Sequence, residues 1–129
     1  MPAPASVTYS SAVKVSANTA VLNAIDAGSS VGKVRFRADN DALLGECLLQ
    51  DPAGTVNGTT GQLTLLPDVA QTVSADGTCT YADVTDSDNN IIVAIPVVAG
   101  VSPVSGTITV NTVAFVTGAS LDILSATIG

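Results

Sequence analysis

Residues 78–98 read TCTYADVTDSDNNIIVAIPVV, two runs of strand-forming residues on either side of a polar turn. Asp and Asn favour such turns because their side chains hydrogen-bond to the nearby backbone. If Asp88 and Asn89 are the two central residues of the turn, the strands pair residue by residue outward from it. The pairs on one face are then Val84 with Val93, Ala82 with Ile95, and Thr80 with Val97. The stretch therefore predicts an antiparallel β-hairpin with one consistent apolar face.

The second strand of this hairpin is apolar on both faces. Ile92 and Val98 lie on the face opposite to Ile95. An antiparallel strand usually leaves one face in water, so a strand that is apolar on both sides needs two covers. We expect the face of Ile95 to fill the core of the chain. We expect Ile92 and Val98 to be covered by another subunit or by a helix near the N-terminus.

The rest of the chain favours the same class of structure. β-branched residues are abundant, and they fit a pleated, half-buried surface. An Asp-Pro-Ala-Gly turn signal at 51–54 is expected to end a strand at 43–50, and Asn57-Gly58 is typical of a hairpin turn. Further strands are expected at 31–37, 62–66, 106–110, 112–117 and 120–128. The sequence predicts an all-β protein: one domain over residues 1–129, an antiparallel β-sandwich, with the jelly roll as one form of it.

The N-terminal segment predicts the single helix. Residues 1–6 are expected to form an extended arm, and the alternation over 7–15 favours a strand. Ser16 or Asn18 can then cap a short helix, which Gly28 would follow as a stop. Its apolar positions share one face: Val21, Leu22 and Ile25.

Charge is scarce and unevenly distributed. Only 12% of residues are charged, about half of the usual ~25%. The formal net charge is −7, but all the basic residues fall within the first 37 positions. A surface with so few charges tends to carry apolar patches that contact other proteins. The acidic remainder disfavours nucleic acid, and no apolar run reaches the ~20 residues of a membrane-spanning helix.

Three of the four cations alternate with apolar residues in one strand. Lys33, Arg35 and Arg37 point to one side of it, and Lys14 lies earlier in the chain. Two interpretations stay open for the three strand cations. They can protect an exposed sheet edge from unwanted pairing, or they can bind a partner.

The residues needed for most catalytic chemistry are missing from the sequence. It contains no histidine, which excludes Ser-His-Asp and Cys-His sites and metal sites that need His. Cys47 and Cys79 lie in apolar runs, where Cys behaves as a small buried hydrophobe, and a disulfide between them stays open. We expect no enzyme activity, no cofactor and no metal site.

Three segments resemble a family of small structural proteins from the particles of tailed bacteriophages. The first joins the early helix to the basic strand, at 21–28 and 32–36. The second is Gly77 to Val84 with the turn at 86–89, where Asn89 replaces an expected glycine. The third is the ending at 121–128.

The resemblance implies a structural component of the particle, most similar to capsid decoration (cement) proteins. Such a protein is made in the bacterial host cytoplasm and binds the major capsid protein on the capsid surface, as a homodimer or homotrimer, without nucleic acid or membrane. We therefore expect Lys14, Lys33, Arg35, Arg37, Ile92 and Val98 to contact the capsid or a second subunit. The alternatives are a tail-associated or fibre protein of the particle, and a surface adhesion domain.

Overall fold

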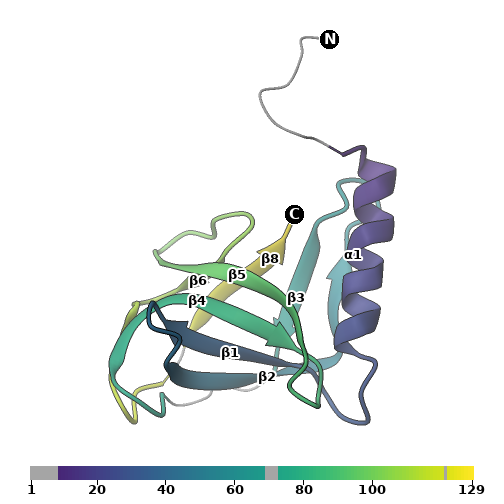
Figure 1. Ribbon diagram of the computed structural model, residues 1–129. Helices are drawn as coiled ribbons and strands as arrows, with labels where there is room; N and C mark the ends of the chain where they lie inside the picture. Colours follow the sequence, from purple (N-terminus) through teal and green to yellow (C-terminus); the bar gives the residue numbers. More distant parts are fainter. Residues whose placement is uncertain (1–8, 69–72, 121) are drawn as a thin grey trace.

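The computed structural model describes residues 9–68, 73–120 and 122–129 (Figure 1). The expected N-terminal arm at 1–6 and residues 7–8 of the expected first strand lie outside these ranges. The described residues form a mostly β structure with one helix. The elements are α1 (Ser11–Ile25), β1 (Lys33–Ala38), β2 (Leu43–Val56), β3 (Leu63–Pro67), β4 (Gly77–Thr85), β5 (Ile91–Ala99), β6 (Ile108–Val110), β7 (Ala114–Phe115) and β8 (Ile123–Ile128).

Seven of these strands close into a barrel, which differs from the sandwich or jelly roll that the sequence predicts. The order is β1-β2-β3-β8-β6-β5-β4, and β4 pairs back onto β1 to close the ring. Neighbours are antiparallel except for β5 and β6, which are parallel. The short β7 pairs with the start of β4, where Gly77 lies opposite Phe115. Because β1 is paired on both sides, it is not an edge strand, and the edge-protection interpretation of its cations is wrong.

β2 makes this closure possible because different parts of it pair with two different strands. Its first half pairs with β1 and its second half with β3, with an irregularity in the register between Leu49 and Gly54. The expected turn at 51–54 is therefore a bend within one strand and does not end it. The turn expected at Asn57-Gly58 is confirmed, since Asn57 N donates to Gln62 O at 2.8 Å.

The β4–β5 hairpin confirms the predicted pairing of Ala82 with Ile95 and of Val84 with Val93. The turn is longer than predicted, because Asp86 N donates to Asn90 O and leaves three residues between them. Asn89 takes a left-handed conformation, with φ at 67°. Asn tolerates this conformation better than most residues, which permits a three-residue loop with a register shift next to it.

α1 begins earlier than predicted, so residues 11–15 of the strand expected at 7–15 are helical. Ser10 caps it, since its Oγ accepts a hydrogen bond from Val13 N at 3.3 Å. The alternation of Val13 and Val15 therefore belongs to a helix, which ends at Ile25 with Asp26 as its C-cap. Figure 1 shows α1 standing beside the barrel next to β2 and β3.

The core lies inside the barrel. Phe36 from β1 and Phe115 from β7 meet edge to face, with ring centroids 5.6 Å apart. Val34 shares this interior with Ala82, Val84 and Ile95, the three residues that the hairpin pattern placed on one apolar face, whereas Thr80, predicted on the same face, is exposed. In the described part of the chain, no helix is long and apolar enough to cross a membrane.

Candidate interaction surfaces

The cations of β1 lie on the outside of the barrel, as their alternation predicted. Val34 and Phe36 are fully buried, whereas Lys33, Arg35 and Arg37 keep part of their surface exposed. In the register with β2 and β4, Arg35 lies between Glu46 and Asp83, and Arg37 lies beside Tyr81. We call this surface the outer face: Lys33, Arg35, Arg37, Glu46, Tyr81 and Asp83.

Carboxylates of the same chain already engage both arginines. Arg37 Nε lies 2.6 Å from Asp83 Oδ2, and the Asp83 side chain is only 6% exposed. Arg37 also donates from Nη1 to the carbonyl oxygen of Asp41 at 3.0 Å. Arg35 Nε lies 3.3 Å from Glu46 Oε2, close enough for an ion pair but not aligned as a hydrogen bond.

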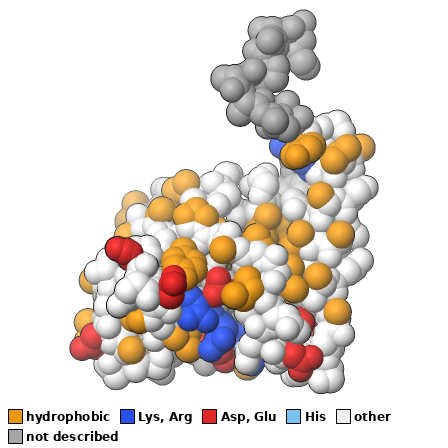
Figure 2. Space-filling model, viewed as in Figure 1, with side chains coloured by type: hydrophobic (Ala, Val, Ile, Leu, Met, Phe, Trp, Pro, Cys, Tyr) orange, Lys and Arg blue, Asp and Glu red, His pale blue; other side chains and the backbone are white. Residues whose placement is uncertain are grey.

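The remaining polar groups of the outer face are also engaged. Lys33 Nζ donates to Asn89 Oδ1 at 3.0 Å. The Tyr81 hydroxyl donates to Asp41, and this hydrogen bond raises the pKa of Tyr81. Figure 2 shows the result as basic and acidic side chains gathered together on the lower half of the barrel. The outer face is therefore internally compensated and does not form a free basic patch.

Lys14 lies apart from the other three cations. It belongs to α1, and its Cβ packs close to Gly61 in the β2–β3 turn. No carboxylate of the described residues lies within ion-pair distance of its ammonium group. The structure thus separates the four predicted contact cations into three on β1 and one near the other end of the molecule.

Ile92 and Val98 are both half-buried within the chain itself. Ile92 packs against the core, and α1 contacts β5. Val98 lies opposite Thr109 of β6, and Thr109 is fully buried. The segment after β5 folds back here, since Val104 N donates to Thr109 Oγ1 at 3.1 Å. Part of the second cover that β5 requires therefore comes from this chain.

The two thiols are buried on core strands and no disulfide joins them. Burial raises the pKa of the Cys79 thiol to about 11. Burial and the nearby Asp68 carboxylate also raise the pKa of Cys47. Thiols with raised pKa values are poor nucleophiles and poor metal ligands near neutral pH.

The acidic turn at 86–90 is occupied by its own hydrogen bonds. The Asp86 carboxylate accepts from Asp88 N, Asn90 N and Asn90 Nδ2 at 2.9–3.0 Å. These hydrogen bonds lower the pKa of Asp86, and the one from the Asn90 side chain has the largest effect. Within the described ranges, no three His, Cys, Asp or Glu residues are grouped so that they could hold a metal ion.

Sequence reasoning did not find the apolar end of the barrel, where four segments meet. We call it the acid-free end: residues 9–20, 57–62, 101–107 and 127–129. Asn18 Nδ2 donates to Gly61 O at 2.6 Å, Gln62 Nε2 to Ser105 Oγ at 3.3 Å, and Gly106 N to Thr127 Oγ1 at 2.8 Å. None of these residues has an acidic side chain, and Lys14 has the one charged side chain among them.

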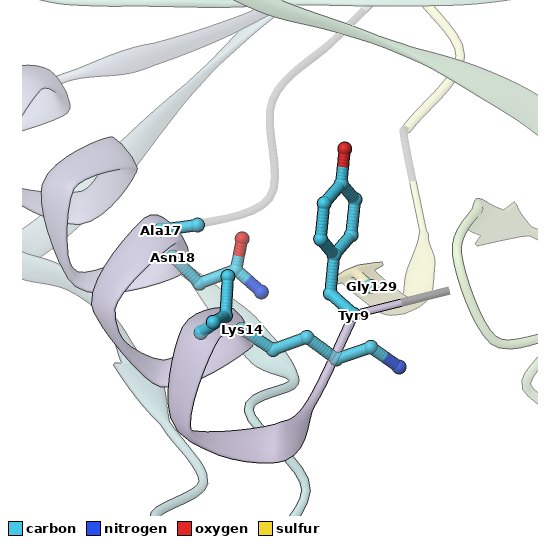
Figure 3. A pocket seen from close by; sticks show the side chains of 6 residues that line it. Tyr9, Lys14, Ala17, Asn18 and Gly129 are labelled. Carbon is cyan, nitrogen blue, oxygen red and sulfur yellow. The ribbon is translucent and has the colours of Figure 1, made fainter. Parts of the chain in front are cut away.

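A hollow of about 510 Å³ opens at this end (Figure 3). Tyr9, Val13, Lys14, Ala17, Asn18 and Gly129 line it. The figure shows Tyr9 standing across from the side of α1 that carries Ala17 and Asn18, with the Lys14 side chain running past the foot of Tyr9. The lining is mostly apolar, with Lys14 at its margin.

Four of the seven exposed large apolar residues described belong to the acid-free end. They are Tyr9, Val13, Val101 and Val104, and Val101 is 96% exposed. One signal in the sequence points to this region, since residues 89–121 contain no charged residue at all. The sequence does not show that this span meets the start of α1.

Comparison with family models, curated proteins and solved structures gave no match to this chain.

Proposed function

We propose that this protein is a non-enzymatic structural component of a bacteriophage particle that decorates and stabilises the outside of the capsid. It binds the lattice of the major capsid protein. The observation that carries the proposal is the concentration of exposed apolar side chains on an end of the barrel that has no acidic side chain. Exposed apolar patches of this kind are typical of surfaces that bind other proteins.

The closed barrel supports attachment through side chains. An open sheet can add a partner's strand along a whole edge, whereas each of the seven barrel strands has a neighbour on both sides over at least part of its length. Two surfaces offer clustered side chains to a partner, namely the outer face and the acid-free end. The outer face is close to neutral in charge, so it suits a partner that offers both signs of charge.

The chemistry of the chain also supports a binding role. The sequence has no histidine, and its two thiols are buried with raised pKa values. The Asp86 carboxylate accepts hydrogen bonds within its own turn, and Arg37 and Asp83 form an ion pair with each other.

Co-sedimentation tests the proposal directly. The full chain is mixed with empty heads from the phage that encodes it, with isolated tails, and with unassembled major capsid subunits. We expect it to pellet with heads and to leave the free subunits unbound, because several weak contacts add up only on a repeated lattice. Equal binding to free subunits, or no binding to heads, contradicts the proposal. Binding to tails alone favours the tail-associated alternative.

Substitutions then locate the attachment surface. Lys33 has no carboxylate partner among the described residues, so Lys33→Gln removes a charge without breaking an ion pair. If the outer face contacts the capsid, this variant binds heads more weakly, and the loss is largest at low salt. The matched variant is Lys14→Gln, which removes the same charge from the acid-free end, so weaker head binding by Lys14→Gln alone assigns the contact to that end. Unchanged head binding by Lys33→Gln argues against the outer face as the contact.

A further inference from the structure

The β2–β3 turn holds an asparagine followed by a glycine on the surface of the molecule. Asn57 and Gly58 are both exposed, and they come directly after the last residue of β2. An asparagine in this position can lose ammonia without an enzyme, because no side chain shields the next backbone nitrogen from its amide carbon. Asn57 is the only asparagine in the sequence that precedes a glycine. Whether the reaction occurs in the folded chain depends on how the turn holds these atoms.

The attacking and the leaving nitrogen are both without hydrogen bonds in this turn. Among the described residues, neither Gly58 N nor Asn57 Nδ2 has a hydrogen-bond partner. A Cβ built on Gly58 would meet nothing within 4 Å, so the space beside this residue is open. Gly58 N can therefore approach Asn57 Cγ without first breaking a hydrogen bond or displacing a neighbouring side chain.

The oxygen of the same amide is held by two donors. Thr59 N and Thr60 N donate to Asn57 Oδ1 at 2.8 Å and 3.0 Å. When Gly58 N attacks Cγ, negative charge develops on Oδ1. Backbone N–H groups that already point at this oxygen stabilise the charge as it forms. The turn thus supplies a small oxyanion hole for the reaction of its own side chain.

The other asparagines lack this combination. Each of the other six precedes a residue that has a side chain. Asn18 Nδ2 is engaged with two carbonyl oxygens, and Asn90 Nδ2 is engaged with the Asp86 carboxylate. Asn23 is exposed, as Asn57 is, but it lies within α1 and precedes an alanine. Asn23 therefore serves as an internal reference.

We propose that Asn57 deamidates spontaneously in the folded protein. Gly58 N loses its proton to hydroxide and forms a bond to Asn57 Cγ, and Nδ2 takes a proton from water and leaves as ammonia. Water then opens the resulting five-membered succinimide at either carbonyl, which gives aspartate or isoaspartate. The attack is intramolecular, so water is the only other reactant.

Either product places an acidic side chain in the acid-free end, to which Asn57 belongs. The formal net charge then becomes one unit more negative than −7. Isoaspartate also adds a methylene group to the backbone next to a fixed point, because Gly61 N donates to Asn57 O at 2.8 Å and Gly61 O accepts from Asn18 Nδ2. The reaction itself needs only the turn and water, so it goes beyond the proposed function and does not depend on it.

Incubation of the folded full chain at mildly alkaline pH tests the proposal. Pepsin digestion at low pH then stops the reaction, and mass spectrometry locates any gain of about 1 Da, the difference between an amide and an acid. We expect this gain at Asn57 well before Asn23, together with a more acidic species in anion-exchange chromatography. The rate should rise with pH, because base removes the proton from Gly58 N.

Gly58→Ala is the matched variant, since its added Cβ meets nothing within 4 Å and should leave the turn intact. It should deamidate about tenfold more slowly or less, because the added side chain hinders the approach to Asn57 Cγ. Thermal unfolding shows whether the variant keeps the fold. Wild type unfolded in urea gives a second comparison that needs no variant. The folded chain should convert at least as fast, because only the folded turn directs two N–H groups at Oδ1.

Three results overturn the inference: slower conversion of Asn57 in the folded chain than in the unfolded one, equal rates for wild type and Gly58→Ala, or equal conversion of Asn57 and Asn23. None of these results concerns binding to heads. The proposed function therefore stands or fails by co-sedimentation alone.

Discussion

Asn18, in the middle of α1, donates a hydrogen bond from Nδ2 to the carbonyl oxygen of Gly61 at 2.6 Å. The same Nδ2 lies 3.2 Å from the carbonyl oxygen of Ile128, at the end of β8. One amide group thus ties the helix to the β2–β3 turn and to the last strand. Asn18 is 7% exposed, and it is the one buried polar residue of α1. The position of the helix on the barrel therefore depends on this side chain.

We expect Asn18→Ala to lower the free energy of unfolding by about 1–3 kcal/mol, because two carbonyl groups lose their donor. Urea denaturation followed by circular dichroism measures the change. Asn23→Ala is the control, since Asn23 lies on the exposed side of the same helix and should change stability by less than about 0.5 kcal/mol. Similar losses for the two variants would show that Asn18 does not hold the helix.

Gly32 allows the end of α1 to approach the end of β4. A Cβ placed there would lie 2.3 Å from Ile25 Cγ2 and 2.9 Å from the carbonyl oxygen of Thr85. Ile25 is fully buried and the second contact is backbone, so neither atom can move away easily. We expect Gly32→Ala to destabilise the fold by about 1–3 kcal/mol.

The control for Gly32 is Gly58→Ala in the β2–β3 turn, where a Cβ meets nothing within 4 Å. The urea concentration at the midpoint of unfolding, measured for both variants, shows whether the added Cβ at position 32 destabilises the fold. A Gly32→Ala protein as stable as Gly58→Ala would mean that the helix can shift without cost.

Local pairing could be predicted from the sequence, whereas closure of the barrel could not. The pairing of Ala82 with Ile95 follows from counting outward from one turn, because the partners are close in sequence. The pairing of Val34 with Val84 closes the ring across 50 positions, and no local pattern specifies it. β2 misled the prediction because Pro52 and Gly54 mark a turn in most chains, whereas here they sit in a bent strand.

For the candidate surfaces, too, the sequence predicts what depends on local pattern and misses what depends on distant pairing. The alternation of Val34 with Arg35 placed the β1 cations outside, and that is where they lie. Their carboxylate partners could not be predicted, because Glu46 and Asp83 reach them only through the barrel register. The acid-free end brings together four segments, so composition alone could not reveal it.

Both thiols should be unreactive in the folded protein. Burial raises the pKa of Cys79 to about 11 and also raises the pKa of Cys47, so little thiolate is present at pH 8. A thiol-specific chromogenic reagent should therefore label neither residue until urea unfolds the chain, and then both. Rapid labelling before unfolding would contradict the buried positions. Failure to label the unfolded chain without reductant would reveal a disulfide.

The Arg37–Asp83 pair should contribute more to the free energy of unfolding than the Arg35–Glu46 pair. The side chains of the first pair are 20% and 6% exposed, and those of the second are 22% and 38% exposed. Less water around Asp83 strengthens its attraction to Arg37 and raises the cost of leaving it unpaired. Double-mutant cycles with Arg37→Gln and Asp83→Asn should give a coupling of about 1–3 kcal/mol.

The matched cycle uses Arg35→Gln and Glu46→Gln, for which we expect less than about 1 kcal/mol. Urea unfolding of the singles and doubles gives both coupling energies. Equal couplings for the two pairs would show that Asp83 is better hydrated than its burial indicates.

The β4–β5 turn should make stability depend on pH in the acid range. Hydrogen bonds from the Asn90 side chain, from Asn90 N and from Asp88 N, with the nearby charge of Lys33, hold the pKa of Asp86 below its ordinary 3.8. The folded state therefore favours the ionised carboxylate. Its contribution to stability is present above pH 3.8 and is lost as the pH falls through the lower folded-state pKa.

Asp86→Asn should consequently have a lower melting temperature than wild type at neutral pH. The difference between the two melting temperatures should become smaller between about pH 4 and pH 2. Thermal unfolding across this range, at constant ionic strength, measures the difference. Asp88→Asn is the control, because it removes one carboxylate from the same turn while leaving intact the hydrogen bonds that Asp86 accepts. The turn hydrogen bonds are not the source of the pH dependence if the difference in melting temperature between Asp86→Asn and wild type is the same at every pH. The same conclusion follows if Asp88→Asn approaches wild type at low pH as Asp86→Asn does.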